Sequence, residues 1–117
     1  MKKLTLVSLQ KTSFVNSTSH GFWDTPDTVE TVPAKLALIH SELSEALEEF
    51  RKGRMDLWYL DVKPGREPQP EGFGIELADA VIRIADLAEH LGINLTALVK
   101  IKSDYNVGRE RMHGKKV

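Results

Sequence analysis

The clearest pattern in the chain is an apolar stripe at helical spacing between Pro33 and Lys52. At 100° per residue, its members fall within an arc of about 100°; they are Leu36, Ile39, Leu43, Ala46, Leu47 and Phe50. Proline suits the first turn of a helix because its missing N–H has no partner there, and Gly53 is typical of the position after a helix end. The pattern predicts an amphipathic helix over 33–52 whose apolar stripe faces the core.

Three further segments have the periodicity of helices. The first is predicted over Lys3–Asn16 and is followed by a polar, turn-rich segment over Ser17–Asp27. Another is predicted over Phe73–Leu91, where the polar residues occupy an arc of only about 80°. A helix with so wide an apolar surface must lie centrally or contribute to a subunit interface. The last is predicted over Leu95–Arg111, with Asn94 as its N-cap.

Between these helices, residues 54–72 have no helical period. They contain five turn-forming residues, which are Pro64, Gly65, Pro68, Pro70 and Gly72. A loop is therefore predicted at 54–72, with room for a short ordered turn in DLWYLDV, and loops this long in small domains are often functional. Four helices without a convincing strand pattern predict an all-α bundle of four to five helices in a single domain over 1–117.

Composition and charge exclude several classes of protein. Of the 117 residues, 41% are apolar and 28% are charged, which is typical of a globular chain rather than a disordered one. A net charge of −1 provides no basic field for a nucleic acid polymer, and the absence of cysteine excludes disulfides and thiolate catalysis. No apolar run approaches the roughly 20 residues of a membrane helix, so we expect no membrane partner and a cytoplasmic protein.

Carboxylates with matching spacing stand on two of the predicted helices. Glu42, Glu45 and Glu49 project within about 60° of one another beside the apolar stripe. Glu76 and Asp79 lie one turn apart on the polar arc of the helix over 73–91. In a partly dry groove these acids would repel one another strongly, and a hard divalent cation such as Mg²⁺ removes that repulsion.

Two other interpretations of the acids were weighed. An acidic pair on a helix is most often solvated surface, and this interpretation stays open for each pair taken alone. A di-iron carboxylate bundle requires Glu-x-x-His on two helices, and only Glu110 and His113 have that spacing. Mg²⁺ is therefore the expected metal, with Mn²⁺ as a possible substitute.

Polar groups continue the apolar side of the last predicted helix. Lys102, Asn106 and Arg109 fall on that side, with Tyr105 beside them. Such groups point inward or into a groove, and a lysine, an asparagine and an arginine in line suit phosphate oxygens. The alternative is that basic groups near a helix C-terminus only complement the helix dipole.

The turn-rich segment after the first helix holds candidates for base recognition. Trp23, with Phe22 beside it, could stack on a base with a gain of about 1–3 kcal/mol. Asn16 and His20 could hydrogen-bond base edges. Alternatively, the two aromatic residues are core anchors that fix the exit of the first helix.

With these motifs, the chain resembles the MazG-like, all-α nucleoside triphosphate pyrophosphohydrolases over nearly its whole length. The resemblance rests on GFWD (21–24), IHSELSEALEEFRKG (39–53), IELADAVIRIADLAEHLGINL (75–95) and KSDYNVGR (102–109). Glu-x-x-Glu followed, after a spacer, by Glu-x-x-Asp, Ile-Arg and Asp-Leu-Ala is its specific part. The chain departs from the family pattern at Ser41, where many members have a glutamate, and in its somewhat long spacer.

The resemblance implies an oligomeric, Mg²⁺-dependent enzyme that cleaves nucleoside triphosphates between the α- and β-phosphates, giving a monophosphate and pyrophosphate. The implied metal ligands are Glu42, Glu45, Glu76 and Asp79. The implied phosphate-contacting residues are Lys102, Asn106 and Arg109, of which Lys102 and Arg109 would stabilise charge that builds on the phosphates.

Several alternatives stay open at this point. Glu45 or Glu49 accepts the proton of the attacking water, and their spacing does not choose between them. The assembly is expected to be a homodimer or a homotetramer. A nucleotide- or protein-binding bundle without turnover, and a structural bundle with solvated acids, are the competing functions.

Overall fold

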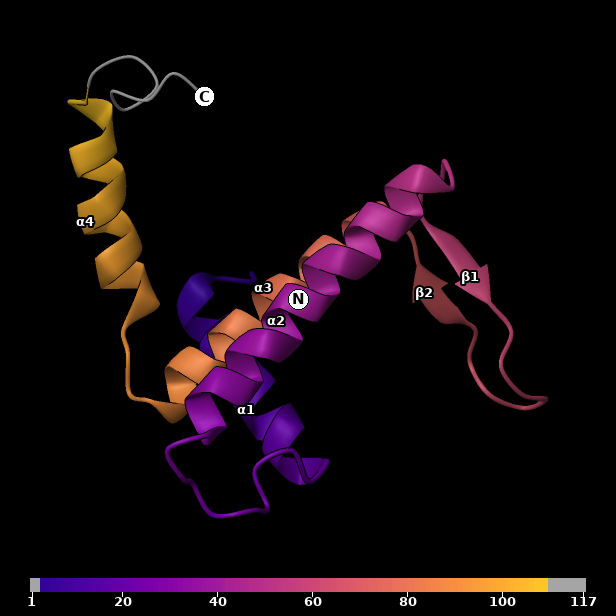
Figure 1. Ribbon diagram of the computed structural model, residues 1–117, viewed down its shortest axis with the longest axis horizontal. Helices are drawn as coiled ribbons and strands as arrows, with labels where there is room; N and C mark the ends of the chain where they lie inside the picture. The colour runs from indigo at the N-terminus through magenta and orange to yellow at the C-terminus, as the bar shows by residue number, and fades with distance from the viewer. Residues whose placement is uncertain (1–2, 110–117) are drawn as a thin grey trace.

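The computed structural model describes residues 3–109, which form four helices and one short hairpin (Figure 1). In chain order the elements are α1 (Leu6–Ser19), α2 (Thr31–Arg51), β1 (Trp58–Leu60), β2 (Gln69–Glu71), α3 (Phe73–His90) and α4 (Leu95–Val107). This confirms that the protein is mostly helical. The expected helix end at Arg111 and the Glu110/His113 pair lie outside the described residues.

Local capping explains where α1 begins, whereas α2 begins without a side-chain cap. α1 starts three residues later than predicted because Thr5 is its N-cap: Ser8 N donates to Thr5 Oγ1 at 3.0 Å, and Thr5 N donates to Ser8 Oγ at 2.9 Å. α2 starts at Thr31, so that Pro33 is its third residue, still within the turn whose N–H groups have no helical partner. α2 ends one residue before its predicted end.

α3 agrees closely with the sequence pattern, whereas α4 ends at Val107, four residues before its predicted end, with Gly108 as its C-cap. α3 covers 73–90, one residue less than predicted, and α4 begins where expected because Ala97 N donates to Asn94 Oδ1 at 3.1 Å. Across the described residues, no helix has both the length and the apolar character that a membrane span requires.

The segment predicted as a loop contains a hairpin that the sequence did not reveal. β1 and β2 pair antiparallel, with Trp58 opposite Glu71 and Leu60 opposite Gln69. The hairpin is joined to α3 through Gly72, whose φ is 123° and where a Cβ atom would come within 2.5 Å of the Asp56 carbonyl oxygen. This close approach places Glu71 directly beside the start of α3.

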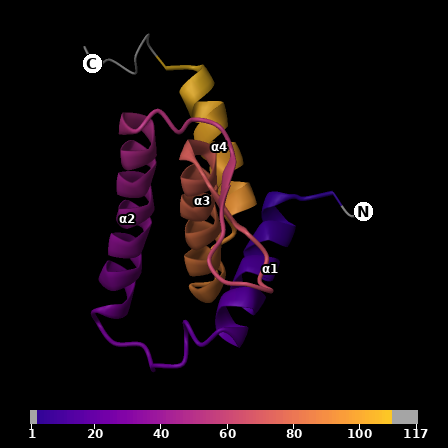
Figure 2. The same cartoon turned by 90° about the vertical axis from the view of Figure 1, so that its right-hand side faces the viewer.

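α3 is the central element of the described chain. It packs against α1 on one side and α2 on the other, as Figures 1 and 2 show, and the sequence predicted a central position for this helix. α4 makes its main contacts with α1 and stands away from the α2–α3 pair (Figure 1). The α2–α3 pair is therefore the packed part of the chain that lies next to the hairpin.

The buried core of a single chain is small. Its apolar members are four alanines and one leucine, which are Ala46, Ala80, Ala85, Leu87 and Ala88. The radius of gyration is 17.0 Å, whereas a compact domain of this length has a radius near 13 Å, as a rough estimate. The chain thus leaves much of its apolar surface uncovered.

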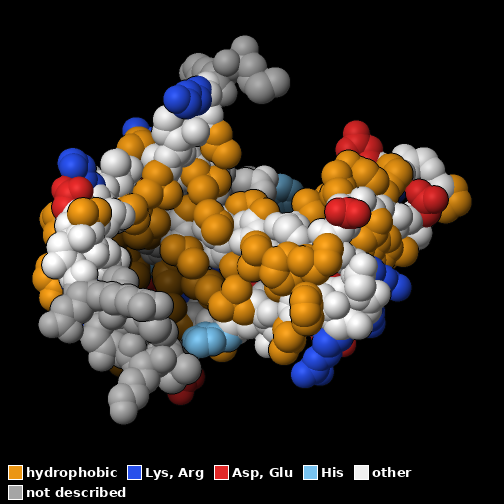
Figure 3. Space-filling view, turned by 90° about the horizontal axis from the view of Figure 1, so that it is seen from above, with side chains coloured by type: hydrophobic (Ala, Val, Ile, Leu, Met, Phe, Trp, Pro, Cys, Tyr) orange, Lys and Arg blue, Asp and Glu red, His pale blue; other side chains and the backbone are white. Residues whose placement is uncertain are grey.

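Most of the apolar stripe of α2 is uncovered within one chain, and only Ala46 among its six members is buried, so the predicted orientation holds only in part. Leu43 and Leu47 are each 49% exposed and Phe50 is 59% exposed, whereas Glu42 and Glu49 are buried against α3. α4 has no buried residue at all in its described span. Figure 3 shows hydrophobic side chains gathered across one broad face of the molecule.

Candidate metal centre

Carboxylates from two helices converge at the end of the α2–α3 pair that adjoins the hairpin. One oxygen each of Glu42, Glu45 and Glu76 lie within 4.8 Å of one another. α2 presents the first two of these residues at i, i+3 spacing, and α3 presents the third. The packing of α2 on α3 thus brings together three of the four metal ligands predicted from the sequence.

Asp79, the fourth predicted ligand, lies on the Glu42 side of this group. Burial raises the pKa of Asp79 above its ordinary value of 3.8, the negative charge of Glu42 raises it further, and Arg83 acts in the opposite direction. Asp79 and Glu42 line the same cleft, together with Glu45 and Glu76. All four predicted ligands therefore border one acidic region.

A second group of oxygens shares Glu76 with the first. One oxygen each of Glu49, Glu71 and Glu76 also lie within 4.8 Å of one another, and Trp58 Nε1 donates to Glu49 Oε2 at 3.4 Å. Glu71 was missed from the sequence because it belongs to the segment predicted as a loop. Its only signal was an acid five residues before Glu76.

Glu76 is the most strongly perturbed of these acids. Burial is the first cause that raises its pKa, the contact with Glu45 and the charge of Glu45 are next, and together with Glu71 and Asp79 they raise it from 4.5 to about 8. Its Oε2 atom is buried and has no hydrogen-bond partner among the described residues. An oxygen in these surroundings requires a proton or a cation.

This donor set fits a hard divalent cation. Every candidate ligand is a carboxylate, and Mg²⁺ and Mn²⁺ prefer oxygen ligands over the imidazole and thiolate groups that suit zinc or copper. The acids border a cleft of about 390 Å³, together with Lys52, Gln69 and Pro70. Such a cleft leaves space for the water and phosphate oxygens that usually complete a magnesium shell.

Arg83 is paired with one of the predicted ligands. Its Nε donates to Glu42 Oε1 at 2.7 Å, and the Glu42 side chain is only 8% exposed. The sequence placed Arg83 on the polar arc of the third predicted helix but gave it no role in the site. Its guanidinium partly compensates the negative charge at the Glu42 end of the cleft.

A second cavity, of about 230 Å³, adjoins the acidic cleft and shares Glu42 and Asp79 with it. α1, α2 and α3 line it together with the segment after α1. Two residues predicted to bind the base, Asn16 and Trp23, lie on its wall. His20, the other candidate for base edges, has its Nδ1 atom 2.7 Å from the Asn16 carbonyl oxygen.

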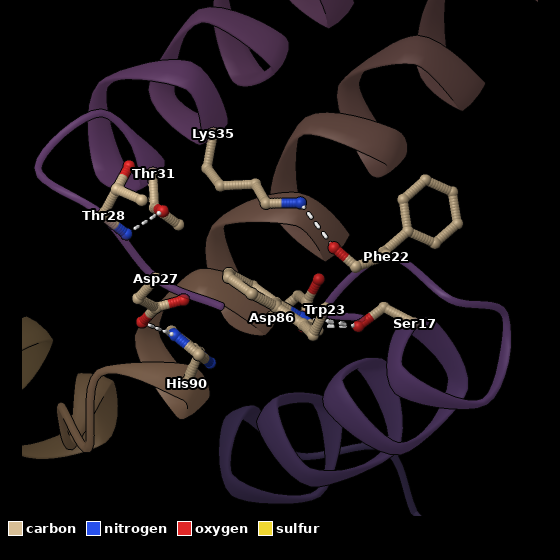
Figure 4. Close-up of polar contacts among 9 residues, drawn as sticks. All are labelled: Ser17, Phe22, Trp23, Asp27, Thr28, Thr31, Lys35, Asp86 and His90. Atoms are coloured by element: carbon tan, nitrogen blue, oxygen red, sulfur yellow. Dashed lines mark hydrogen bonds and ion pairs between the residues drawn. The ribbon is translucent and has the colours of Figure 1, made fainter. Parts of the chain in front are cut away.

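Trp23 is held on its edge and on both faces (Figure 4). Its Nε1 donates to Asp86 Oδ1 at 2.9 Å and to Ser17 Oγ at 3.0 Å. The ring stacks on His90 with a centroid distance of 3.7 Å, and Lys35 Nζ lies 4.4 Å from the ring centroid. A base can therefore stack on Trp23 only if Lys35 moves.

The predicted phosphate-contacting residues form a separate cluster on α4 and in the turn directly after it, where Arg109 lies. Lys102 Nζ lies 4.8 Å from the Tyr105 ring centroid and Arg109 Cζ lies 5.5 Å from it. Asn106 follows Tyr105, and its Oδ1 is buried without a described hydrogen-bond partner. No residue of α4 is among those that line the acidic cleft of the same chain.

Comparisons of the chain with protein-family models, with curated proteins and with solved structures find no match. The chemistry of the site is therefore argued from its geometry. An acidic cleft that fits a divalent cation adjoins a cavity that apolar and polar side chains line together, and such a pair of concave surfaces suits a small molecule.

Proposed function

We propose that this protein is a Mg²⁺-dependent nucleoside triphosphate pyrophosphohydrolase of the MazG-like type. It cleaves between the α- and β-phosphates and releases a nucleoside monophosphate and pyrophosphate. The observation that carries the proposal is the convergence of Glu42 and Glu45 on Glu76, whose buried Oε2 has no hydrogen-bond partner among residues 3–109, beside a second cavity. Mn²⁺ is expected to replace Mg²⁺, because both prefer the same oxygen ligands.

Glu42, Glu45, Glu76 and Asp79 would hold the metal. When bound, Mg²⁺ would neutralise phosphate charge and lower the pKa of a coordinated water. Of the two candidates for the proton acceptor, Glu45 belongs to the first carboxylate group, whereas Glu49 is buried beside it and fixed by Trp58. We therefore assign proton acceptance to Glu49 and metal binding to Glu45.

The proposed enzyme works as a homodimer or homotetramer. The small core of one chain, the exposed stripe of α2 and the absence of buried residues on α4 all favour burial against further copies. In this arrangement α4 of one copy would bring Lys102, Asn106 and Arg109 to the phosphates in the cleft of another copy. Tyr105 would support the two cationic side chains.

Incubation with nucleoside triphosphates and Mg²⁺, with readout of both monophosphate and pyrophosphate, tests the proposal. Glu45→Ala and Asp79→Ala are expected to lower kcat/KM by at least about 100-fold, because each removes charge that holds the metal. Glu67→Ala is the matched control, since Glu67 is an exposed glutamate between β1 and β2 that lines neither the acidic cleft nor the adjoining cavity.

Two results would contradict the proposed enzyme. Equal activity in Glu45→Ala, Asp79→Ala and Glu67→Ala would show that turnover does not depend on the acidic cleft. Mg²⁺-dependent nucleotide binding without any pyrophosphate release would instead identify a binding bundle that has no turnover.

A further inference from the structure

Asp86 lines the cavity beside the acidic cleft, and one of its two carboxylate oxygens has no hydrogen-bond donor among the described residues. Its Oδ1 accepts hydrogen bonds from Trp23 Nε1 at 2.9 Å and from Ser17 Oγ at 2.7 Å, which lock the orientation of the carboxylate (Figure 4). No described residue donates to its Oδ2, and Asp86 lines the cavity. A carboxylate oxygen can only accept a hydrogen bond, so the ligand must offer a donor here.

The other polar groups of the cavity do not impose such a choice. Lys35 Nζ donates to the Phe22 carbonyl oxygen at 2.9 Å and Arg83 Nε donates to Glu42, and both side chains keep further N–H groups. Those donors suit the acceptor atoms that every base carries, so they do not distinguish one base from another. The side chain of Asn16 can donate as well as accept, and it suits either kind of ligand atom. Asp86 is therefore the group in the cavity that can distinguish one base from another.

Asp86 is placed along α3 where the base of a nucleotide would lie if its phosphates bound at the acidic cleft. Asp86 follows Asp79 by seven residues, which is two turns on the same face and about 10 Å of helix rise. Arg83 lies between them and separates the metal-binding end from the cavity. Apolar side chains of the same cavity can contact the faces of a base; they are Phe22, Trp23, Leu38, Ile82 and Leu87.

From this geometry we propose that the cavity selects nucleotides whose base carries an amino group at C4 of a pyrimidine or C6 of a purine, and that Asp86 Oδ2 accepts a hydrogen bond from that amine. Cytosine and adenine satisfy the acceptor. Uracil and hypoxanthine present a carbonyl oxygen at the same position, which the carboxylate repels. This inference rests on the proposed function, because it assigns the specificity of the same site.

Matched substrate pairs test the selection. The pairs are CTP with UTP and ATP with ITP, and the pair that is turned over faster is the one that decides. Within that pair, the nucleotide with the amino group is expected to have a kcat/KM at least about tenfold higher. Asp86→Asn should reverse the preference: the amide oxygen can keep the bonds from Trp23 and Ser17 while the amide NH₂ donates to a carbonyl. Asp61→Asn, an exposed change of the same kind in the hairpin, is the control.

A binding measurement without metal separates this inference from the enzymatic proposal. Calorimetry in EDTA with CMP against UMP, and AMP against IMP, should show the same preference as turnover. Preferential binding without hydrolysis would reject the enzyme and support the cavity assignment. Hydrolysis with equal efficiency within both pairs would reject the cavity assignment and support the enzyme.

Three further outcomes would overturn the role of Asp86. One is an Asp86→Asn protein that keeps the amino preference. Another is an Asp86→Asn protein in which only the ratio of kcat/KM between ribose and deoxyribose substrates changes. That result would show that the carboxylate contacts the sugar. The third is the absence of both hydrolysis and selective binding in the unmodified protein.

Discussion

Arg83 Nε lies 2.7 Å from Glu42 Oε1, and this ion pair joins the centre of α3 to the buried acidic side of α2. The Glu42 side chain is 8% exposed, whereas that of Arg83 is 34% exposed. A buried carboxylate without a cation carries a large desolvation penalty, so the pair supports the α2–α3 contact when no metal is bound. It also sets Arg83 between the acidic cleft and the adjoining cavity.

Arg83→Ala should therefore destabilise the metal-free protein. It leaves Glu42 buried without its partner, and we expect the free energy of unfolding to fall by about 1–3 kcal/mol in EDTA. The loss should be smaller in Mg²⁺, which would replace the missing positive charge. Urea unfolding under both conditions measures it.

The control for this variant is Arg51→Ala, because Arg51 forms an exposed pair with Glu48. Exposed pairs contribute about 0–1 kcal/mol. An equal effect of the two substitutions, or an Arg83→Ala deficit that Mg²⁺ leaves unchanged, would contradict the proposed charge balance.

Metal-free stability should decrease with rising pH. The pKa of Glu76 is about 8 in the folded protein against 4.5 as its ordinary value, so between these pH values the folded state keeps a proton that the unfolded state has lost. The free energy of unfolding should fall over this window by an amount on the order of 3 kcal/mol. Unfolding curves in EDTA at several pH values measure the slope.

Glu76→Gln should remove most of this slope and increase metal-free stability at pH 8, because a neutral amide replaces the carboxylate that resists ionisation. Saturating Mg²⁺ should flatten the slope in the unmodified protein. Stability that rises between pH 5 and pH 8 in EDTA would show that Glu76 is not surrounded by acids as described.

Gly72→Ala should disturb the acidic cleft from the hairpin side. The φ of 123° is unfavourable for alanine, and its Cβ would meet the Asp56 carbonyl oxygen, so we expect a loss of about 1–3 kcal/mol. Mg²⁺ affinity should fall as well, because Glu71 and Glu76 flank this glycine. Calorimetric titration with Mg²⁺ gives both the affinity and the stoichiometry.

Gly74→Ala is the matched control for this substitution. Nothing lies within 4 Å of the Cβ position at Gly74, which is inside α3, so alanine there should be neutral or stabilising by about 0.4–1 kcal/mol. Unchanged metal affinity in Gly72→Ala would show that the hairpin does not contribute to the metal site.

The exposed stripe of α2 should mediate association between copies. Leu47→Glu places a charge in that stripe and should lower the mass of the assembly in light scattering at micromolar concentration. Leu60→Glu, on the hairpin and similarly exposed, should not change it. A monomeric unmodified protein would contradict the proposed assembly.

If α4 serves the cleft of another copy, two inactive variants should complement each other. Mixing Glu76→Gln with Arg109→Ala should restore about one quarter of the activity in a dimer, because half of the molecules are mixed and each of these has one intact site. Glu76→Gln mixed with Asp79→Ala should restore none, since both changes affect the same side. If the first mixture recovers no activity, α4 does not act in the cleft of another copy.

Much of the secondary structure followed from local signals. The caps at Asn94 and Thr5, the glycines after the helices and the 3.6-residue period act within a few residues, so they can be recognised along the chain. The spacing of Glu42, Glu45, Glu76 and Asp79 also predicted two matched acidic pairs, and the structure brings all four to one region. The capping role of Thr5 was overlooked, although its signal was local.

Other features depended on contacts that no local pattern records. Glu71 joins the acids because a three-residue strand pairs across a Pro-rich segment, and Arg83 meets Glu42 across 41 positions of the chain. Asp86 is fixed by Trp23 and Ser17, which belong to a different helix and its exit turn. Such partners become neighbours only when the helices pack.

By itself, the sequence determined where the helices lie and that acidic pairs stand beside an apolar stripe on α2. Only the tertiary structure decided that the acids, and not Leu43 or Leu47, face α3, and that α4 stands away from the cleft. The physical reason is that periodicity fixes the direction of a side chain around its own helix axis. It does not state whether that direction is covered by another part of the same chain.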